Sequence, residues 1–199
     1  KLHEINIPEV HAAREAAGHG VPLMVDVNCP WTPEEAKSMA LAFKAYDILW
    51  LEEPINPPEN FQALSKLRTE TEMAIAAGEN ACTAFEFKKM MEANAIDFVQ
   101  PSVTKVGGIT EFRKIATLCE VYGVQLMPHS PYFGPGFLAT LHLSQAIPNS
   151  GMIERIFIEP ETNLYGNSTY NPVNGAFGAP GGNGLGLEPD TDVLKTYRV

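Results

Sequence analysis

The sequence lacks long hydrophobic runs and is poor in positive charge. No apolar stretch among its 199 residues approaches the roughly 20 residues that a membrane-spanning helix needs. Lys and Arg together number 14 against 24 Asp and Glu, which gives a net charge of −10 at pH 7. This balance argues against a nucleic-acid backbone or an anionic membrane surface as a partner. No basic segment followed by a short apolar run is visible, so we expect no secretory signal.

Cysteine is also scarce. Cys29, Cys82 and Cys119 are odd in number and far apart, a pattern that indicates reduced thiols rather than a disulfide framework and favours a cytoplasmic location. Apolar residues at 45% and charged residues at 19% are sufficient to bury a core, which excludes a disordered chain. The length suits one large domain or two small ones.

Short apolar runs alternate with helical signals along most of the chain. Each run is nearly continuous, which is typical of strands buried on both faces of a parallel sheet. Capping boxes at Thr32 and Thr83, and a helix-ending glycine at position 123, mark helices between the runs. This alternation predicts βαβ units and a parallel α/β fold. We expect strands at 21–27, 48–51, 73–76, 96–100, 124–127 and 152–158, and helices at 8–17, 32–46, 58–67, 83–94, 110–122 and 137–147.

A polar or ionisable residue stands at or just after the end of every predicted strand. In a (β/α) barrel such residues converge on one mouth, where enzymes of this architecture keep their chemistry. A doubly wound open sheet would spread them along an edge and usually carries a glycine-rich phosphate loop, whose spacing the segment 105–108 lacks. We therefore expect a barrel. The residues, 24 to 27 positions apart, are Asp26, Glu52, Glu79, Lys105, His129 and Glu154.

Three of these residues are carboxylates on adjacent strands. Asp26, Glu52 and Glu79 would repel one another if they met without a cation between them. Hard oxygen ligands with room for water and substrate suit Mg²⁺ better than Zn²⁺, which prefers His and Cys. For each acid alone, the alternative is a solvated loop residue or a helix cap. Their shared position at strand ends favours a magnesium site.

Each of the other polar residues has a functional and a plain interpretation. His129 titrates near neutral pH and is a candidate general acid or base, unless it is a hydrogen-bonded packing residue. Lys105 is either a solvated loop lysine or, beside a metal, a base that abstracts a proton. Glu154 either joins the other strand-end residues at the mouth or forms an ordinary ion pair with Arg155. Asn28 either donates to an oxyanion or shapes the turn after the first predicted strand.

Short motifs surround these strand-end residues. They are Met24-Val25-Asp26-Val27-Asn28, Trp50-Leu51-Glu52-Glu53-Pro54, Ala77-Gly78-Glu79-Asn80, Gln100-Pro101 with Lys105-Val106-Gly107-Gly108, Pro128-His129-Ser130 and Ile153-Glu154-Arg155. In this order and spacing they resemble the enolase superfamily, specifically its mandelate racemase/muconate lactonizing enzyme-like branch. The resemblance runs from Lys1 through at least Ile158, with a family-like tail at 184–186.

The resemblance implies a fold, a metal and a reaction. The fold is a modified (β/α)₇β barrel, and the reaction is removal of the proton α to a substrate carboxylate that Mg²⁺ holds. Such a proton is very weakly acidic, so the developing negative charge needs a divalent cation beside it. By resemblance, Asp26, Glu52 and Glu79 are the metal ligands, His129 is the base and Lys105 is the lysine of the sixth strand. By the same resemblance, Glu154 hydrogen-bonds the substrate carboxylate and Asn28 lies near metal and substrate. Glu53 sits beside a ligand, where it would support the metal site without contacting the metal.

The chain departs from the family pattern in three ways. Ser102 stands where an Asp usually orients the histidine, so we expect His129 to be a weaker base or to have another partner, and we place Ser102 among the substrate-binding residues. Lys1-Leu2-His3 matches the end of a Lys-x-Lys motif, with Lys1 and His3 as candidate catalytic residues. The N-terminal capping domain and the first barrel strands have no counterpart. We therefore expect a partial barrel at 1–160 and, at 161–199, a Gly/Asn/Pro-rich segment that returns toward a capping domain.

The favoured function is a Mg²⁺-dependent lyase that dehydrates a sugar acid, with His3 and His129 as base and acid. The alternative within the family is a racemase, epimerase or cycloisomerase, although a 1,1-proton transfer needs two competent bases. The alternative from another class is a non-catalytic metal-binding homologue or an inactive fragment. The expected partner is a small-molecule carboxylate substrate, and the resemblance also implies a homo-oligomer.

Overall fold

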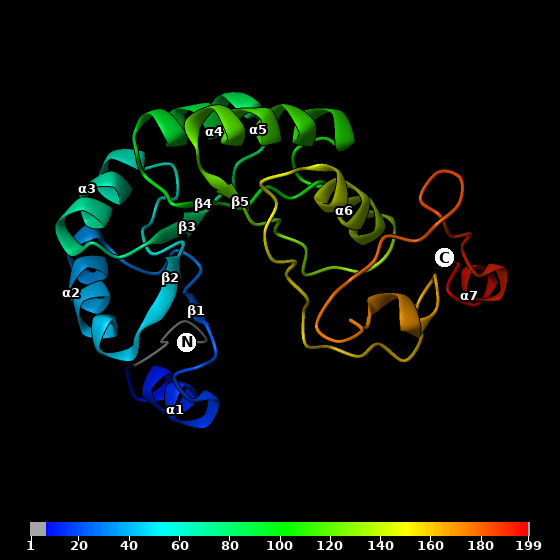
Figure 1. Ribbon diagram of the computed structural model, residues 1–199, viewed down its shortest axis with the longest axis horizontal. Coiled ribbons are helices and arrows are strands. Elements are labelled where there is room, and N and C mark those ends of the chain that lie inside the picture. The colour runs from blue at the N-terminus through cyan, green and yellow to red at the C-terminus, as the bar shows by residue number, and fades with distance from the viewer. Residues whose placement is uncertain (1–6, 199) are drawn as a thin grey trace.

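The computed structural model describes residues 7–198, the side chains of residues 167 and 168 excepted. Five parallel strands form one sheet whose spatial order is the order along the chain. Each strand therefore joins the sheet beside its predecessor after one helical crossover, and the sheet lies inside an arc of helices (Figure 1). The predicted parallel α/β fold is confirmed. The strands are β1 (Leu23–Asp26), β2 (Ile48–Glu52), β3 (Ile75–Ala77), β4 (Phe98–Val99) and β5 (Gln125–Leu126).

Helices cover the outer side of the sheet, and the predicted caps are formed. The hydroxyl of Thr32 accepts a hydrogen bond from the Glu35 amide, and the Glu35 carboxylate accepts one from the Thr32 amide. Thr83 and Glu86 repeat this capping box. Gly123 ends its helix at φ 67°, a left-handed conformation that suits glycine. The helices are α1 (Ile7–Ala17), α2 (Pro33–Phe43), α3 (Phe61–Thr71), α4 (Ala84–Glu92), α5 (Ile109–Tyr122), α6 (Pro135–Ala146) and α7 (Thr191–Thr196), with 3-10 helices η1 (Lys44–Tyr46) and η2 (Asn167–Tyr170).

Consecutive residues of each strand face opposite sides of the sheet, so the strands contribute to two separate hydrophobic clusters. The larger cluster lies between the sheet and the helices, and the smaller one lies on the inner, concave side. A strand-end residue two positions from a member of the smaller cluster lies on the same face of its strand and therefore also faces the concave side. The larger cluster takes Val25, Leu51, Ile75, Val99 and Leu126 from the strands, and the smaller takes Trp50, Ala76 and Met127, with Met24 and Phe98 packed against them.

The prediction of a sixth strand at 152–158 is wrong. The chain meets β5 at one isolated parallel bridge, between Leu126 and Ser150, beside a 2.7 Å hydrogen bond from the Gly151 amide to the Leu126 carbonyl. Beyond that point it runs as loop, and Phe157 is 97% exposed. A strand needs a pairing partner and a covered face, and within residues 7–198 no strand lies on the outer edge of this segment. The described strands thus form an open arc rather than a closed barrel.

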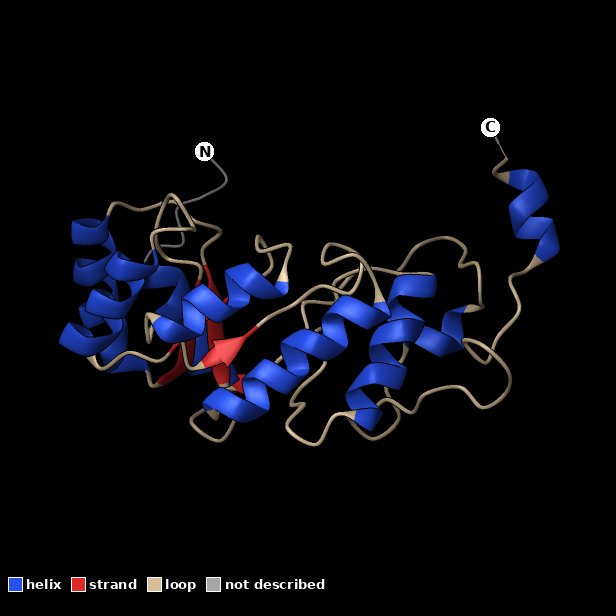
Figure 2. Ribbon diagram, turned by 90° about the horizontal axis from the view of Figure 1, so that it is seen from above, coloured by secondary structure: helices blue, strands red, loops and turns tan. Residues whose placement is uncertain are grey.

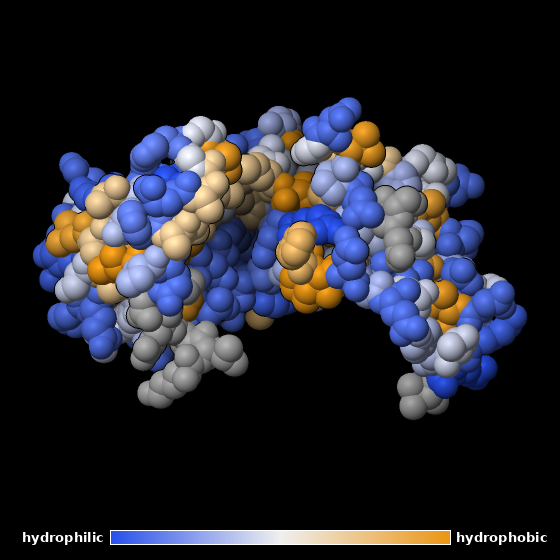
Figure 3. Space-filling model, turned by 90° about the horizontal axis from the view of Figure 1, so that it is seen from below, coloured by the Kyte–Doolittle hydropathy of each residue, from blue (hydrophilic) through white to orange (hydrophobic). Residues whose placement is uncertain are grey.

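The last part of the chain consists mostly of loops, and α7 lies far from the sheet (Figure 2). Tyr170 anchors this part, because its ring packs on Phe133 and Phe137 and its hydroxyl accepts a hydrogen bond from the Gly134 amide at 3.0 Å. Seen from below, the molecule is arched, with hydrophilic residues along much of the inner side (Figure 3). None of the described helices is long and apolar enough to cross a membrane.

Candidate active site

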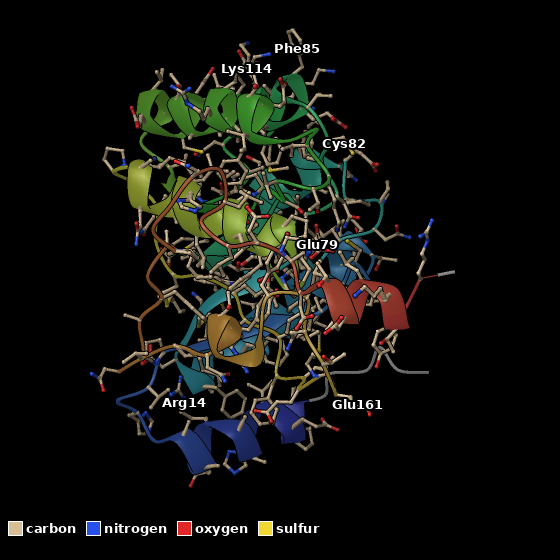
Figure 4. The ribbon with its side chains drawn as sticks, turned by 90° about the vertical axis from the view of Figure 1, so that its right-hand side faces the viewer. Arg14, Glu79, Cys82, Phe85, Lys114 and Glu161 are labelled. Carbon is tan, nitrogen blue, oxygen red and sulfur yellow. The ribbon has the colours of Figure 1, made fainter. Side chains whose placement is uncertain are left out.

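The predicted rim residues lie at the carboxyl ends of the strands. Asp26 and Glu52 are the last residues of β1 and β2 and are partners in the parallel register of these strands. Glu79 follows β3 by two residues and lies in the middle of the molecule (Figure 4). Lys105 and His129 follow β4 and β5. Because parallel strands end at the same edge, the fold brings these side chains to one rim.

Asn28 holds the carboxylate of Asp26. Its backbone amide donates to Asp26 Oδ1 at 2.9 Å, and its side-chain amide donates to Oδ2 at 2.8 Å. Burial nevertheless raises the pKa of Asp26 above its usual value, and the charges of Glu79 and Glu154 add to this rise against the lowering effect of Asn28. Asn28 thus both shapes the turn, at φ 53°, and orients a candidate metal ligand.

Glu52 is the most perturbed carboxyl group on the rim. It is 8% exposed, and the indole Nε1–H of Trp50 donates to its Oε2 at 3.0 Å. Burial, with the charges of Asp26 and Glu154, raises the pKa of Glu52 to about 7 against the lowering effect of hydrogen bonds from Gln100 and Trp50. Sequence reasoning missed Trp50, although its place two residues before Glu52 puts both on the same face of β2.

His129 lies between two carboxylates. Its Nδ1 is 2.8 Å from Glu79 Oε2 and 3.3 Å from Glu154 Oε2. Burial opposes a charged imidazole, but hydrogen bonding and attraction by Glu154 and Glu79 outweigh it and raise the pKa of His129 to about 9. The same contact holds the pKa of Glu79 below its usual range despite burial. Lys105 Nζ, 3.5 Å from Glu79 Oε1, completes this charged group.

Glu154 belongs to the rim rather than to an ion pair with Arg155. The amide of Ser130 donates to Glu154 Oε2 at 3.0 Å, and the Ser130 hydroxyl donates to the Glu154 carbonyl at 2.8 Å. Arg155 instead donates to the Tyr170 carbonyl at 2.7 Å. Ser130 is a residue that sequence reasoning missed, and its only signal was its place directly after His129.

Ser102 lies behind the rim. It is fully buried, at 0% exposed, and its hydroxyl is 2.9 Å from Thr104 Oγ1 and 3.4 Å from the hydroxyl of Tyr132. The ring of Tyr132 packs edge-on at 6.4 Å from the imidazole of His129. The hydroxyl of Ser102 thus lies behind Tyr132, and the Ser102 carbonyl accepts a hydrogen bond from the amide of the rim residue Lys105 at 3.0 Å. The candidate residues Lys1 and His3 lie outside the described residues.

The carboxylates fit Mg²⁺ in chemistry and charge, but their present orientation is not that of a metal site. Within residues 7–198 no three His, Cys, Asp or Glu side chains are grouped so as to hold an ion, and the Glu79 carboxylate contacts His129 and Lys105. Asp26 and Glu52 nevertheless repel each other and share a water-poor rim, as their raised pKa values indicate. A cation bound by these oxygens would relieve that repulsion once Glu79 turned from His129.

A sheet that adds parallel strands in one direction, with acidic residues at adjacent strand ends, defines a parallel α/β domain with a polar rim. Residues 3–193 match the family model described as enolase C-terminal domain-like, and the chain belongs to this family. The resemblance to the mandelate racemase/muconate lactonizing enzyme-like proteins of the enolase superfamily is thereby confirmed.

Individual relatives are similar over nearly the whole chain. It is 31% identical to a D-xylonate dehydratase of Haloferax volcanii, over 99% of this chain and 47% of the relative. It is also 31% identical to a D-galactarolactone cycloisomerase of Agrobacterium fabrum, over 98% of this chain and 54% of the relative. The L-talarate dehydratase of Polaromonas sp. JS666, crystallised with Mg and L-glucarate, superposes with a TM-score of 0.82 at 30% identity, over 97% of this chain and 50% of that one. The chain spans about half the length of the curated relatives it matches.

Proposed function

We propose that this chain is the catalytic part of a Mg²⁺-dependent lyase that removes the proton α to a carboxylate and then eliminates water from a sugar acid. The observation that carries the proposal is the position of His129 beside Glu79, on a rim that also holds Asp26 and Glu52. The names of the relatives, several of them sugar-acid dehydratases, support it. The proposal includes a closed (β/α)₇β barrel completed by further chain, a cytoplasmic location and a homo-oligomer.

We assign the residue roles from the family resemblance, and the shared rim of the side chains supports them. Asp26, Glu52 and Glu79 would hold Mg²⁺, which when bound stabilises the negative charge that develops on the substrate carboxylate. With Glu79 turned to the metal, His129 would lose one of the two carboxylate contacts that raise its pKa, and as the neutral imidazole it accepts the α-proton when the C–H bond breaks. The electron pair of that bond moves into the new C–C double bond as the β-hydroxyl leaves. That hydroxyl needs a proton to leave as water, which a protonated His129 or, as the sequence suggests, His3 supplies.

The other rim residues position the substrate. Glu154 is fixed by Ser130 and lies 3.3 Å from His129, so its second oxygen is available to a substrate carboxyl or hydroxyl group. Asn28 keeps the Asp26 carboxylate oriented. Lys105 lies on the far oxygen of Glu79, where its charge balances that carboxylate and favours an anionic substrate.

A racemase, epimerase or cycloisomerase is the second candidate. One observation favours it: Lys105 and His129 contact opposite oxygens of Glu79, so two groups able to exchange protons lie on the same rim. One relative is a cycloisomerase by name. A non-catalytic metal-binding homologue is the remaining alternative.

The test is α-proton exchange in D₂O with Mg²⁺ across a set of sugar acids, followed by NMR and mass spectrometry on the natural full-length protein. We expect exchange with loss of water, reduced by about 100-fold or more in His129→Asn. His19→Asn, at an exposed turn, is the matched control and keeps full activity. Exchange without loss of water favours the isomerase. No exchange on any acid, with Mg²⁺ bound, contradicts both enzymatic proposals.

A further inference from the structure

Glu53 lies directly after Glu52 but on the other side of the sheet. It is 3% exposed, and it lines a cavity of about 20 Å³ together with Phe61 of α3 and Met90 of α4. Trp50, two residues before Glu52 on the same face of β2, belongs to the smaller hydrophobic cluster on the concave side, whereas the cavity beside Glu53 is lined in part by helix residues. Glu52 therefore faces the concave side, and Glu53 is buried behind it among the helices.

The carboxylate of Glu53 joins three loops. Its Oε2 accepts the Sγ–H of Cys29 at 3.3 Å and the side-chain amide of Asn80 at 2.7 Å. The amide of Cys29 also donates to the Glu53 carbonyl at 2.7 Å. Cys29 comes three residues after Asp26, and Asn80 comes one residue after Glu79. One buried carboxylate thus connects the three loops that carry Asp26, Glu52 and Glu79.

The backbone of these loops needs such support. Cys29 and Glu53 have φ angles of 54° and 43°, in the left-handed region that side chains other than glycine rarely adopt. Residues in this conformation persist when surrounding contacts fix them. The contacts of Cys29 with Glu53 are of this kind, since they bind a left-handed residue of one loop to a left-handed residue of the next.

We infer that Glu53 is a positioning residue that sets the spacing of Asp26, Glu52 and Glu79 for Mg²⁺ without touching the ion. This inference rests on the proposed function and adds the residue that assembles its metal site. The alternative account is purely electrostatic: the negative charge of Glu53 would attract the cation from a distance, and the spacing of the ligands would not depend on Glu53. The two accounts predict opposite results for one substitution at Asn80.

The experiment measures the Mg²⁺ dissociation constant by titration calorimetry on the natural full-length protein. Glu53→Asp keeps the charge but shortens the side chain, and we expect it to weaken Mg²⁺ binding about 10-fold or more. Asn80→Asp adds a negative charge beside Glu79 but removes the donor to Glu53, and we expect weaker binding here too. Glu34→Asp, an exposed glutamate in the first turn of α2, is the matched control and leaves the constant unchanged.

Thermal unfolding of each variant in EDTA separates loss of fold from loss of metal binding. If Glu53→Asp does not fold, Cys29→Ala removes only one of the hydrogen bonds to Glu53, and we expect a smaller but measurable weakening. Unchanged binding in Glu53→Asp, or tighter binding in Asn80→Asp, overturns the inference and leaves the proposed function standing. Absence of Mg²⁺ binding in the unsubstituted protein overturns both.

Discussion

His129 carries a positive charge at neutral pH in this structure, because Glu154 and Glu79 outweigh the cost of burying it. Glu52, with a pKa of about 7, is half protonated under the same conditions. While Glu79 faces His129, the positive charge of His129 and the proton on Glu52 therefore offset part of the negative charge of the rim carboxylates. A divalent cation can bind only if Glu52 releases its proton. The cation also competes with His129 for the carboxylate of Glu79.

The first prediction is that Mg²⁺ binding becomes tighter as pH rises. Below pH 7 Glu52 holds a proton that the cation must displace, and below pH 9 the charged His129 opposes the cation. Both effects have the same sign, so the dissociation constant falls about 10-fold or more from pH 6 to pH 8. Calorimetry in buffers of different ionisation enthalpy measures both the constant and the protons released. A constant independent of pH over this range would contradict the prediction.

Ser102 illustrates why the partner of His129 could not be identified from the sequence alone. The family pattern places an oriented carboxylate at this position, and a serine cannot supply the charge. The structure shows Glu79 and Glu154 at His129 instead, while Ser102 contacts Tyr132. The partner of a side chain depends on which loops meet in space, and residue spacing along the chain does not contain this information.

At the scale of elements, α1 is joined to the rest of the molecule by Val10, which packs in the larger hydrophobic cluster, and by one buried arginine. Arg14 is 3% exposed and lies between α1 and the body of the molecule (Figure 4). Its guanidinium donates at 2.8 to 2.9 Å to the carbonyls of Gly18, Val21, Tyr46 and Asp47. These carbonyls belong to the turns before β1 and β2, so one side chain fixes the turns that lead into two neighbouring strands.

The second prediction is that Arg14→Lys lowers the free energy of unfolding by about 2 kcal/mol, because an ammonium group cannot reach all four carbonyls in the guanidinium geometry. Urea unfolding followed by circular dichroism measures the change. Arg113→Lys on the exposed face of α5 is the matched control, with a change within about 0.5 kcal/mol. Equal stability of the two variants would show that water replaces the lost bonds at no cost.

At the scale of the whole molecule, the sequence predicts the order of the elements but not where the sheet stops. Capping boxes and apolar runs are local signals, and the predicted helices and the first five strands are present. The rim residues were found because equal intervals along a repeated βα unit place side chains at one edge. The segment 152–158 has the same apolar character as a strand, but its pairing depends on a neighbour that local composition cannot report.

The third prediction concerns hydrogen exchange across the molecule. Both edges of β2 and β3 are paired and both strands are largely buried, whereas every described residue from 172 to 189 is exposed or half-buried. We expect amides of β2 and β3 to exchange slowest and amides of 172–189 to exchange fastest. Exchange measured by mass spectrometry on the natural protein tests this order. Equal protection of β2, β3 and residues 172–189 would show that further contacts in the natural protein protect the amides of 172–189 from exchange.

The opposite directions of Glu52 and Glu53 have a consequence for the kinds of sequence change that β2 can accept. A substitution at Glu52 or at Glu53 alters the contacts of that one side chain. Inserting or deleting a single residue before Glu52 exchanges the two sides, so that one glutamate leaves the concave face and the other leaves the interior. The length of this strand is therefore under tighter restriction than its composition, because a change in length moves both glutamates at once.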